Sequence, residues 1–307
     1  MSNQTSTTDF LLLEFSDERE LQIVHFIVFL ALYLTTVAGN LLIISVVVLD
    51  QHLHTPMYFF LMNLAMTDLG SVSVTIPKSM VNSLMNTRSI SYLGCVTQVY
   101  FFLVFLASDL TLLTVMAHDR YVAICNPLRY ETIMNKGACI QMAASTWLSS
   151  LLYALLHTST TFSMTFCSDI VEQFFCEIPQ LLKISCSDLY LVESILLIFS
   201  VAAALGCFIF VVITYVQIFT TVLRIPSSQG RQKAFSTCIP HLIVFSMFVL
   251  GGMLVYLRPI PHPSPHTNMA FAVIYSVIPP MMNPVIYSMR NKEIKLAMCK
   301  LLNLKLF

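Results

Sequence analysis

The sequence predicts an all-α membrane protein: a seven-transmembrane helix bundle followed by a short amphipathic C-terminal helix. Its 307 residues are 57% hydrophobic and only 10% charged, whereas soluble domains carry about 25% charged residues. Apolar stretches of membrane length recur along the chain, and most basic residues lie in the segments between them. The net charge of zero excludes a nucleic-acid partner, which would require a basic surface.

Seven stretches are long enough to cross about 30 Å of hydrocarbon as helices. They cover residues 24–49, 57–80, 96–121, 139–159, 191–222, 233–257 and 268–288. The second and seventh are interrupted, by Asp68 and Pro77 and by Pro279, Pro280 and Pro284, so six spans is the alternative count. Membrane helices tolerate such interruptions where neighbours satisfy the freed backbone groups. The chain therefore divides into residues 1–23, a seven-helix domain at 24–288, and a C-terminal helix and tail at 289–307.

The basic residues predict the orientation of the bundle. With the N-terminus outside, the inner segments hold eleven Lys and Arg residues and the outer segments five. Because cytoplasmic loops carry the basic excess, we expect an extracellular N-terminus in the plasma membrane. Residues 1–23 lack a cleavable signal, so the first span serves as an uncleaved anchor. Asn3-Gln4-Thr5 is then a glycosylation acceptor at Asn3 that faces the lumen.

Four cysteines are predicted on the oxidising side, where disulfides form. They are Cys95, Cys167, Cys176 and Cys186. Their spacing alone leaves three pairings open. A metal site is the competing interpretation, weakened because His157 is the only histidine nearby.

Asp68 and Asp109 are acids inside apolar spans. Each lies about three turns from the inner end of its helix, so adjacent helices would bring the carboxylates together. Two nearby buried acids cannot both stay ionised without a cation, so they share a proton or bind sodium. The alternative for Asp109 is a hydrogen-bonded structural acid.

Six ordered motifs together resemble the olfactory receptor family of rhodopsin-like G-protein-coupled receptors, in its class II (tetrapod) branch. The resemblance runs from about Phe10 to Ile294. The motifs are Gly39-Asn40, Pro56 to Leu61, Leu64 to Asp68, Met116 to Tyr130, Lys233 to Cys238, and Pro280 to Tyr287.

The resemblance implies a receptor that binds a small volatile odorant and activates a stimulatory G protein of the Golf or Gs type, raising cAMP. It implies no enzyme activity, and the chain lacks His-Glu-x-x-His and Gly-x-Ser-x-Gly motifs. A rhodopsin-like receptor for a non-odorant small molecule is the nearest alternative. A transporter is the alternative from another class, and it would need inverted repeats or polar groups crossing the midplane. Membrane lipid and trafficking chaperones are the other expected partners.

By the same resemblance Cys95 pairs with Cys176, and Cys167 with Cys186. The resemblance also assigns G-protein coupling and the activation switch to a set of residues at the inner half of the bundle. These are Asp119, Arg120, Tyr121, Tyr215, Arg231, Lys233, His241, Asn283, Pro284 and Tyr287. For Arg231 and Lys233, a solvated basic cluster is the alternative.

Ligand-binding positions of the family map onto the outer half of the bundle. They are Phe102, Leu103, Leu106, Ala107, Phe199, Ser200, Ala203, Met253, Tyr256, Val273 and Ser276. Most are apolar, as small-molecule sites between helices are. Phe102 stands where amine receptors carry an aspartate, so a neutral or weakly polar ligand is expected. Tyr256, Ser200 and Ser276 are the candidate hydrogen-bonding groups, and helix packing is the alternative role for the apolar positions.

The chain departs from the family at four places, the first of which is Asp109, where a glutamate is usual. His118 stands where a tyrosine is usual and puts a titratable ring beside Asp119. Gln173 replaces a histidine of a proposed metal-binding trio. Val249 removes the usual aromatic side chain of span six, and Gly251-Gly252 would supply flexibility there instead.

Overall fold

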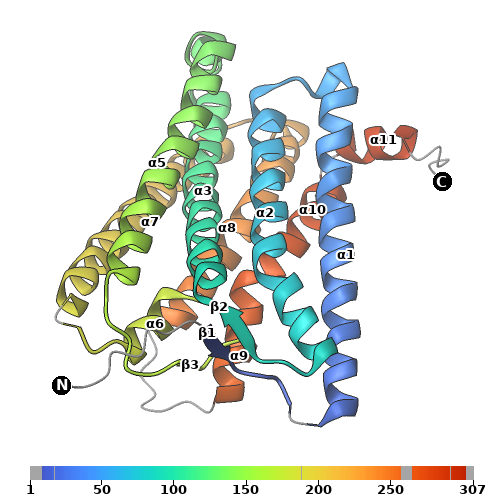
Figure 1. The fold of residues 1–307 in the computed structure, drawn as a ribbon. Helices are drawn as coiled ribbons and strands as arrows, with labels where there is room; N and C mark the ends of the chain where they lie inside the picture. Colours follow the sequence, from blue (N-terminus) through green and yellow to red (C-terminus); the bar gives the residue numbers. More distant parts are fainter. Residues whose placement is uncertain (1–8, 17, 188, 257–264, 291, 302–307) are drawn as a thin grey trace.

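The computed structural model describes residues 9–16, 18–187, 189–256, 265–290 and 292–301. Within them, seven helical segments are long and apolar enough to cross a membrane, as the sequence predicts. They stand side by side as one bundle, with three short strands against one end (Figure 1). We call this the sheet end, and the opposite end the Arg120 end.

The helices run longer than the predicted spans, because polar turns extend each helix beyond the apolar stretch. The long helices are α1 (Arg19–Leu49), α2 (Pro56–Met85), α3 (Tyr92–Cys125), α5 (Lys136–Phe162), α7 (Tyr190–Leu223) and α8 (Ser228–Tyr256). The shorter ones are α4 (Tyr130–Ile133), α6 (Ile178–Ile184), α9 (Pro265–Ser276), α10 (Ile278–Arg290) and α11 (Lys292–Leu301).

Local sequence sets several of these boundaries. Pro56 opens α2, where a missing N–H costs nothing. Asn86 ends α2 in the left-handed region, with φ of 53°. Ser91 caps α3 by accepting a 3.1 Å hydrogen bond from the Gly94 amide, and Asn135 caps α5 in the same way. Each of these helices therefore begins or ends at a residue suited to that position.

The seventh span is divided into α9 and α10 at Val277. Pro279 and Pro280 follow at once, and neither can donate a backbone hydrogen bond. The chain still continues as one membrane segment from Met269 to Tyr287. The interruption that the prolines predict is therefore a local break, and the seven-span count is correct.

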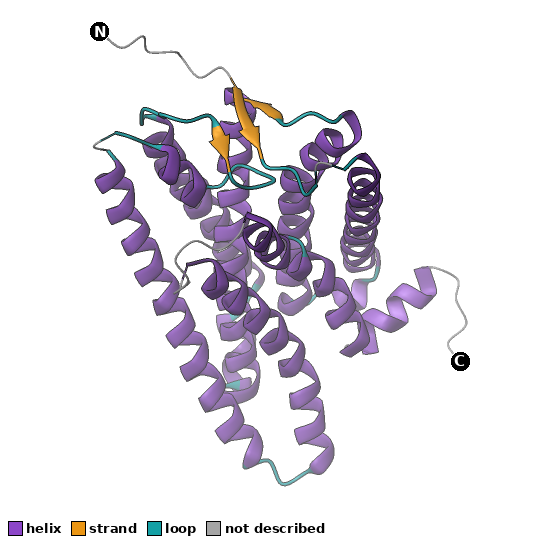
Figure 2. Cartoon of the chain, turned by 90° about the horizontal axis from the view of Figure 1, so that it is seen from below, coloured by secondary structure: helices purple, strands orange, loops and turns teal. Residues whose placement is uncertain are grey.

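The strands were not predicted from the sequence. They are β1 (Asp9–Leu12), β2 (Ser89–Ser91) and β3 (Ile170–Val171), in the order β2-β1-β3. Strand β1 pairs antiparallel with β2 and parallel with β3. Figure 2 shows the three strands together over the helix ends. The segment before the first helix is thus part of the folded bundle, with Phe10 completely buried.

Two glycines allow close helix contacts. A Cβ at Gly39 would lie 3.0 Å from Cβ of Pro284, and one at Gly70 would collide with the ring of Phe105. Helix α1 therefore approaches α10, and α2 approaches α3, more closely than larger side chains would permit.

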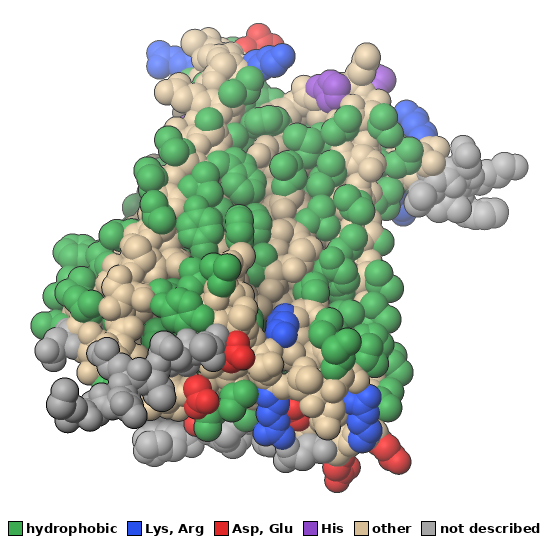
Figure 3. Space-filling view, in the orientation of Figure 1, with side chains coloured by type: hydrophobic (Ala, Val, Ile, Leu, Met, Phe, Trp, Pro, Cys, Tyr) green, Lys and Arg blue, Asp and Glu red, His purple; other side chains and the backbone are tan. Residues whose placement is uncertain are grey.

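Apolar side chains cover the flank of the bundle, and most charged side chains in view lie at its two ends (Figure 3). Helix α7 is the most exposed span, with Ile198 and Phe199 more than 60% exposed. In α11, Ile294 and Ala297 are buried while Leu296 and Leu301 are exposed, so this helix packs one face against the bundle. The predicted C-terminal helix is present.

Candidate functional site

Arg120 lies at the end of α3 in a buried ion pair. Its guanidinium donates to Oδ2 of Asp119 over 2.5 Å and 3.1 Å, and Asp119 also accepts a 2.7 Å hydrogen bond from the hydroxyl of Tyr130. The side chain of Arg120 is 12% exposed and that of Asp119 is 1% exposed. Burial and the neighbouring Asp119 charge raise the pKa of Tyr130, so its hydroxyl stays protonated. Asp119 therefore holds both groups in one latched arrangement.

About two turns deeper in the bundle, His241 joins three helices. Its Nδ1 accepts from the hydroxyl of Tyr215 over 2.8 Å, and its Nε2 lies 2.8 Å from the carbonyl oxygen of Leu113. A carbonyl can only accept, so Nε2 carries the proton and Nδ1 is the acceptor. The ring is completely hydrogen-bonded in this neutral form, and it ties α8 to α3 and α7.

In this conformation the hydroxyl of Tyr215 is engaged by His241. Of the basic residues assigned to the coupling face, Arg231 donates to the carbonyl of Ile225 over 3.4 Å. The side chain of Lys233 lies outside the described residues. Tyr121 packs against the core cluster beside Arg120.

The two acids predicted to meet at the bundle centre are neighbours. Thr67 precedes Asp68 in α2, and its hydroxyl donates to Oδ1 of Asp109 in α3. The two carboxyl groups interact electrostatically. The side-chain amide of Asn283 donates to both oxygens of Asp68, over 2.9 Å and 3.1 Å. The centre of α2, α3 and α10 is therefore one polar cluster.

In this conformation the hydroxyl of Tyr287 is not hydrogen-bonded to Asn40 or Asp68. Asn40 donates to the carbonyl of Pro280 over 3.1 Å, and Asp68 bonds to Asn283. The hydroxyl of Tyr287 is buried and has no hydrogen-bond partner within the described part of the chain. An unsatisfied buried hydroxyl costs free energy that another conformation can recover. A change of conformation that gave the Tyr287 hydroxyl a hydrogen-bond partner would therefore be favourable.

At the sheet end, disulfides join Cys95 to Cys176 and Cys167 to Cys186, the pairs that the resemblance implied. The first bond ties residues 173–177 to the N-terminal end of α3. Glu177 in this segment accepts hydrogen bonds from Tyr275 of α9 and from Gln173. Burial raises the pKa of the Glu177 carboxyl, and these bonds act against that rise. The segment is thus fixed to both α3 and α9.

An aromatic cluster fills the space below this segment. Phe102, Phe174, Phe175, Met269 and Ala272 form its buried part, and Leu106, Val273 and Tyr275 pack against it. The rings of Phe102 and Phe175 lie 5.1 Å apart, edge to face. Leu103 belongs to a neighbouring cluster and Ala107 is half-buried. The structure brings together Phe102, Leu106 and Val273 of the predicted ligand positions.

The predicted ligand residues of span five, Phe199, Ser200 and Ala203, do not belong to the aromatic cluster. Phe199 is 69% exposed and Ala203 is also exposed, so both face the membrane. Ser200 donates to the carbonyl of Leu196 over 2.9 Å, and its oxygen lies 3.0 Å from Nε2 of His157. The nearly uniform hydrophobicity of this segment does not show in the sequence which face is inward.

Ser276 donates to the carbonyl of Ala272 over 2.6 Å, so its hydroxyl is already engaged within its own helix. The side chains of Met253 and Tyr256 lie outside the described residues, as does Asn3.

Sequence reasoning missed a buried pair between α5 and α7. Nδ1 of His157 lies 2.5 Å from Oε1 of Glu193, and the two side chains are 2% and 0% exposed. The ring of Tyr153 lies tilted against that of His157, with the ring centroids 4.5 Å apart. Glu193 reads in the sequence as an exposed acid near the start of a span, and only the tertiary contact reveals its partner.

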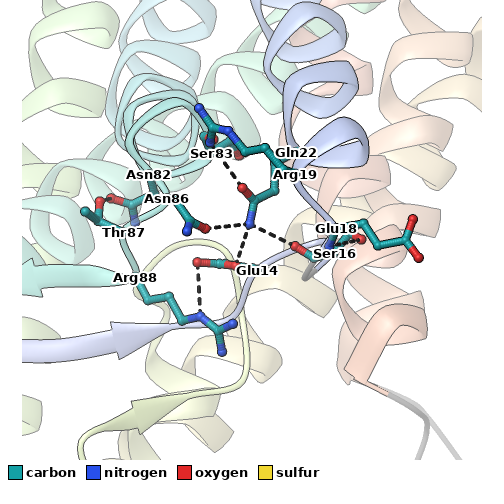
Figure 4. A network of polar contacts seen from close by, with 10 residues as sticks. All are labelled: Glu14, Ser16, Glu18, Arg19, Gln22, Asn82, Ser83, Asn86, Thr87 and Arg88. Carbon is teal, nitrogen blue, oxygen red and sulfur yellow. Dashed lines mark hydrogen bonds and ion pairs between the residues drawn. The ribbon is translucent and has the colours of Figure 1, made fainter.

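A polar network closes the sheet end (Figure 4). Gln22 of α1 donates to Glu14 over 3.0 Å and to Asn86 over 2.8 Å. Glu14 also pairs with Arg88 over 3.0 Å. Arg19 donates to the last carbonyls of α2, at Ser83 and Leu84. The start of α1, the end of α2 and the strand β2 are thus held in one arrangement.

The substitution at His118 has a clear structural consequence. The ring of His118 lies 6.4 Å from that of Phe210 in α7, while Asp119 is paired with Arg120 and Tyr130. His118 therefore faces α7 and does not join the Asp119 latch.

Gly251 is a close-contact position, because a Cβ there would lie 3.0 Å from Cβ of Tyr275. Gly252 has open space around it. Val249 packs against the main core cluster.

Among the described residues, no group of three or more His, Cys, Asp or Glu side chains is placed to hold a metal ion.

The family model for olfactory receptors matches residues 29–305, almost the entire bundle and its C-terminal helix. The chain belongs to the olfactory receptor family.

Similar proteins cover the full length of the receptor. Olfactory receptor 14I1 of Homo sapiens is 53% identical over 302 residues, 98% of this chain and 97% of the relative. Olfactory receptor 14C36 of Homo sapiens is 48% identical over 303 residues, with the same shares covered. Olfactory receptor 1G1 of Gorilla gorilla gorilla is 46% identical over 301 residues, covering 98% of this chain and 96% of the relative.

The structure of the receptor also matches the crystal structure of squid rhodopsin. The TM-score is 0.74 at 16% identity, covering 92% of this chain and 81% of that chain. This likeness shows the shared fold. As a G-protein-coupled receptor of this family, the protein is not an enzyme.

Proposed function

We propose that the receptor binds a small, mostly apolar volatile ligand at the inner side of the aromatic cluster and activates a Golf- or Gs-type G protein, raising cAMP. The buried Arg120–Asp119–Tyr130 latch carries this proposal. A buried guanidinium held by a neighbouring carboxylate is a charge that another conformation can present to a partner.

The position of the sheet end supports an extracellular N-terminus at the plasma membrane. Both disulfides lie at that end, and disulfides persist in oxidising compartments. The Arg120 end then faces the cytoplasm and the G protein.

The apolar ligand class follows from the aromatic cluster, whose members carry no charge. Glu177, whose partner Tyr275 packs against this cluster, is buried and already accepts hydrogen bonds from Tyr275 and Gln173. A charged amine would therefore lack a free counter-ion beside Phe102.

The polar centre fits a proton or a sodium ion. Asp68 and Asp109 supply carboxylate oxygens, and Oδ1 of Asn283 is buried without a hydrogen-bond partner in the described residues. An oxygen-only donor set suits a hard cation. Such a cation would neutralise the paired carboxylates and stabilise the latched conformation.

The test is an odorant screen in cells that express the receptor with trafficking chaperones and a stimulatory G protein. We expect a ligand that raises cAMP in wild type and fails in Arg120→Ala at equal surface level. Transport of a solute without G protein would contradict the proposal. Asp109→Asn should remove any sodium dependence of basal cAMP, and an unchanged dependence would refute the cation site.

A further inference from the structure

A groove opens on the flank of the bundle between α2 and α3, near the sheet end. Its volume is about 550 Å³. Ser73 and Lys78 of α2 line one side, and Leu93 and Thr97 of α3 line the other side. Ser91 of β2 lines the groove at the sheet end. It borders the aromatic cluster, because Val74 both lines the groove and packs against that cluster, and it lies at the opposite end of α3 from Arg120.

Lys78 is the cation of this groove. It stands seven residues before the end of α2 at Met85, which is about 10 Å along a helix. None of the ion pairs between described side chains involves Lys78, and the groove lining contains no acid. A lysine at this depth in a membrane protein needs a counter-charge or a path to the surface.

The hydroxyl groups of the groove differ in what they can offer a ligand. Thr97 donates to the carbonyl of Leu93, so its proton is already used. Ser91 accepts from the Gly94 amide, which leaves its own O–H free to donate. The ammonium of Lys78 and the hydroxyl of Ser91 therefore offer donors to an anion.

The apolar part of the groove indicates which anion. Leu93 is 72% exposed on the same flank, where side chains face hydrocarbon. A free phosphate ion would gain nothing from this surface, whereas an acyl chain would. We propose that the groove binds a phospholipid of the leaflet at the sheet end, with its phosphate on Lys78 and Ser91 and an acyl chain along Leu93.

A lipid in this groove would also contact the elements that hold residues 173–177 over the aromatic cluster. Strand β2 pairs with β1, and α3 carries Cys95, which holds residues 173–177. A phosphate on Ser91 would contact the junction of these elements.

Native mass spectrometry of the receptor released from nanodiscs of phosphatidylcholine and phosphatidylserine tests this proposal. We expect Lys78→Gln to retain about fivefold less phospholipid than wild type, since one basic residue near a lipid surface contributes about a factor of five. Lys78→Arg should retain it. Lys183→Gln, which removes an exposed cation outside the groove, should match wild type.

Thr97→Phe provides a second variant that keeps the lysine and fills the groove. It should lose the phospholipid while the receptor remains monodisperse by size exclusion. Retention of phospholipid by Lys78→Gln and Thr97→Phe at the wild-type level would overturn the proposal. Displacement of the bound lipid by inorganic phosphate alone would also overturn it, because the site would then recognise a free anion.

Discussion

Tyr275 of α9 donates a hydrogen bond to the buried carboxyl of Glu177, which directly follows Cys176, the half-cystine that ties the same loop to α3 through Cys95. The seventh span and the third span are therefore linked through one loop segment, directly above the aromatic cluster. Displacement of either helix by a ligand would be transmitted to the other through this segment.

Removing this hydrogen bond should destabilise the receptor. Tyr275→Phe leaves Glu177 buried with one donor fewer, and a lost bond to a buried carboxyl costs about 1–3 kcal/mol. We expect a lower melting temperature of the purified receptor, measured with a thiol-reactive dye. Tyr33→Phe, which removes a 3.3 Å contact with Ser73 at an exposed site, is the control and should melt close to wild type.

The stability of the sheet end should depend on pH through Glu177. Burial raises its pKa in the folded chain above the ordinary glutamate range. The folded state therefore binds the proton more tightly than the unfolded state, so the contribution of Glu177 is complete below the unfolded pKa and is lost as pH rises through the folded pKa. Glu177→Gln should flatten this part of the melting-temperature profile. An identical profile in the variant would contradict the account.

Breaking the latch should raise basal signalling. Asp119→Asn removes the charge that holds Arg120 and Tyr130, so we expect higher cAMP without ligand at matched surface level. Tyr130→Phe removes only the 2.7 Å bond and should have a smaller effect. Basal cAMP at or below wild type in Asp119→Asn would show that the latch does not restrain signalling.

The pair between α5 and α7 should be structural. Glu193→Ala leaves His157 buried without its partner, and breaking a buried pair costs about 3–5 kcal/mol. We expect strongly reduced surface expression, measured by flow cytometry of an epitope tag. Ser200→Ala should leave the ligand concentration for half-maximal cAMP unchanged, because the hydroxyl of Ser200 is occupied by Leu196 and His157.

The two glycines of α8 should differ. Alanine at Gly251 would place a Cβ 3.0 Å from that of Tyr275, whereas alanine at Gly252 meets open space. Both gain about the same helix propensity. Gly251→Ala should therefore melt below Gly252→Ala, and equal melting temperatures would show that α8 and α9 are not tightly packed there.

The sequence predicts most of the fold because membrane helices are set by composition and length. Hydrophobicity locates all seven spans, and helix-breaking residues such as Pro279 and Pro280 locate the break in the last one. The strand at Asp9–Leu12 is not visible in the same way, since a four-residue segment carries no periodic signal and is specified by its partners β2 and β3.

The site is predicted unevenly for the same reason. Asp68 and Asp109 stand out because acids are rare in apolar spans, and depth along the helix places them together. The inward face of α7 could not be predicted, because apolar residues occur on every face of that helix and its rotation is fixed by contacts with α3, α5 and α8. Phe199 and Ala203 are exposed in the structure, and Ser200 contacts His157 of another helix.

The most direct test of where the ligand binds compares two phenylalanines in the cAMP assay with one active odorant. Phe102 is 5% exposed within the aromatic cluster, and Phe199 is 69% exposed towards the membrane. At matched surface level, Phe102→Ala should raise the half-maximal ligand concentration about tenfold or more, since a buried aromatic contact is worth more than 1.4 kcal/mol. Phe199→Ala should leave it unchanged. A large shift in Phe199→Ala with none in Phe102→Ala would contradict the ligand site described above.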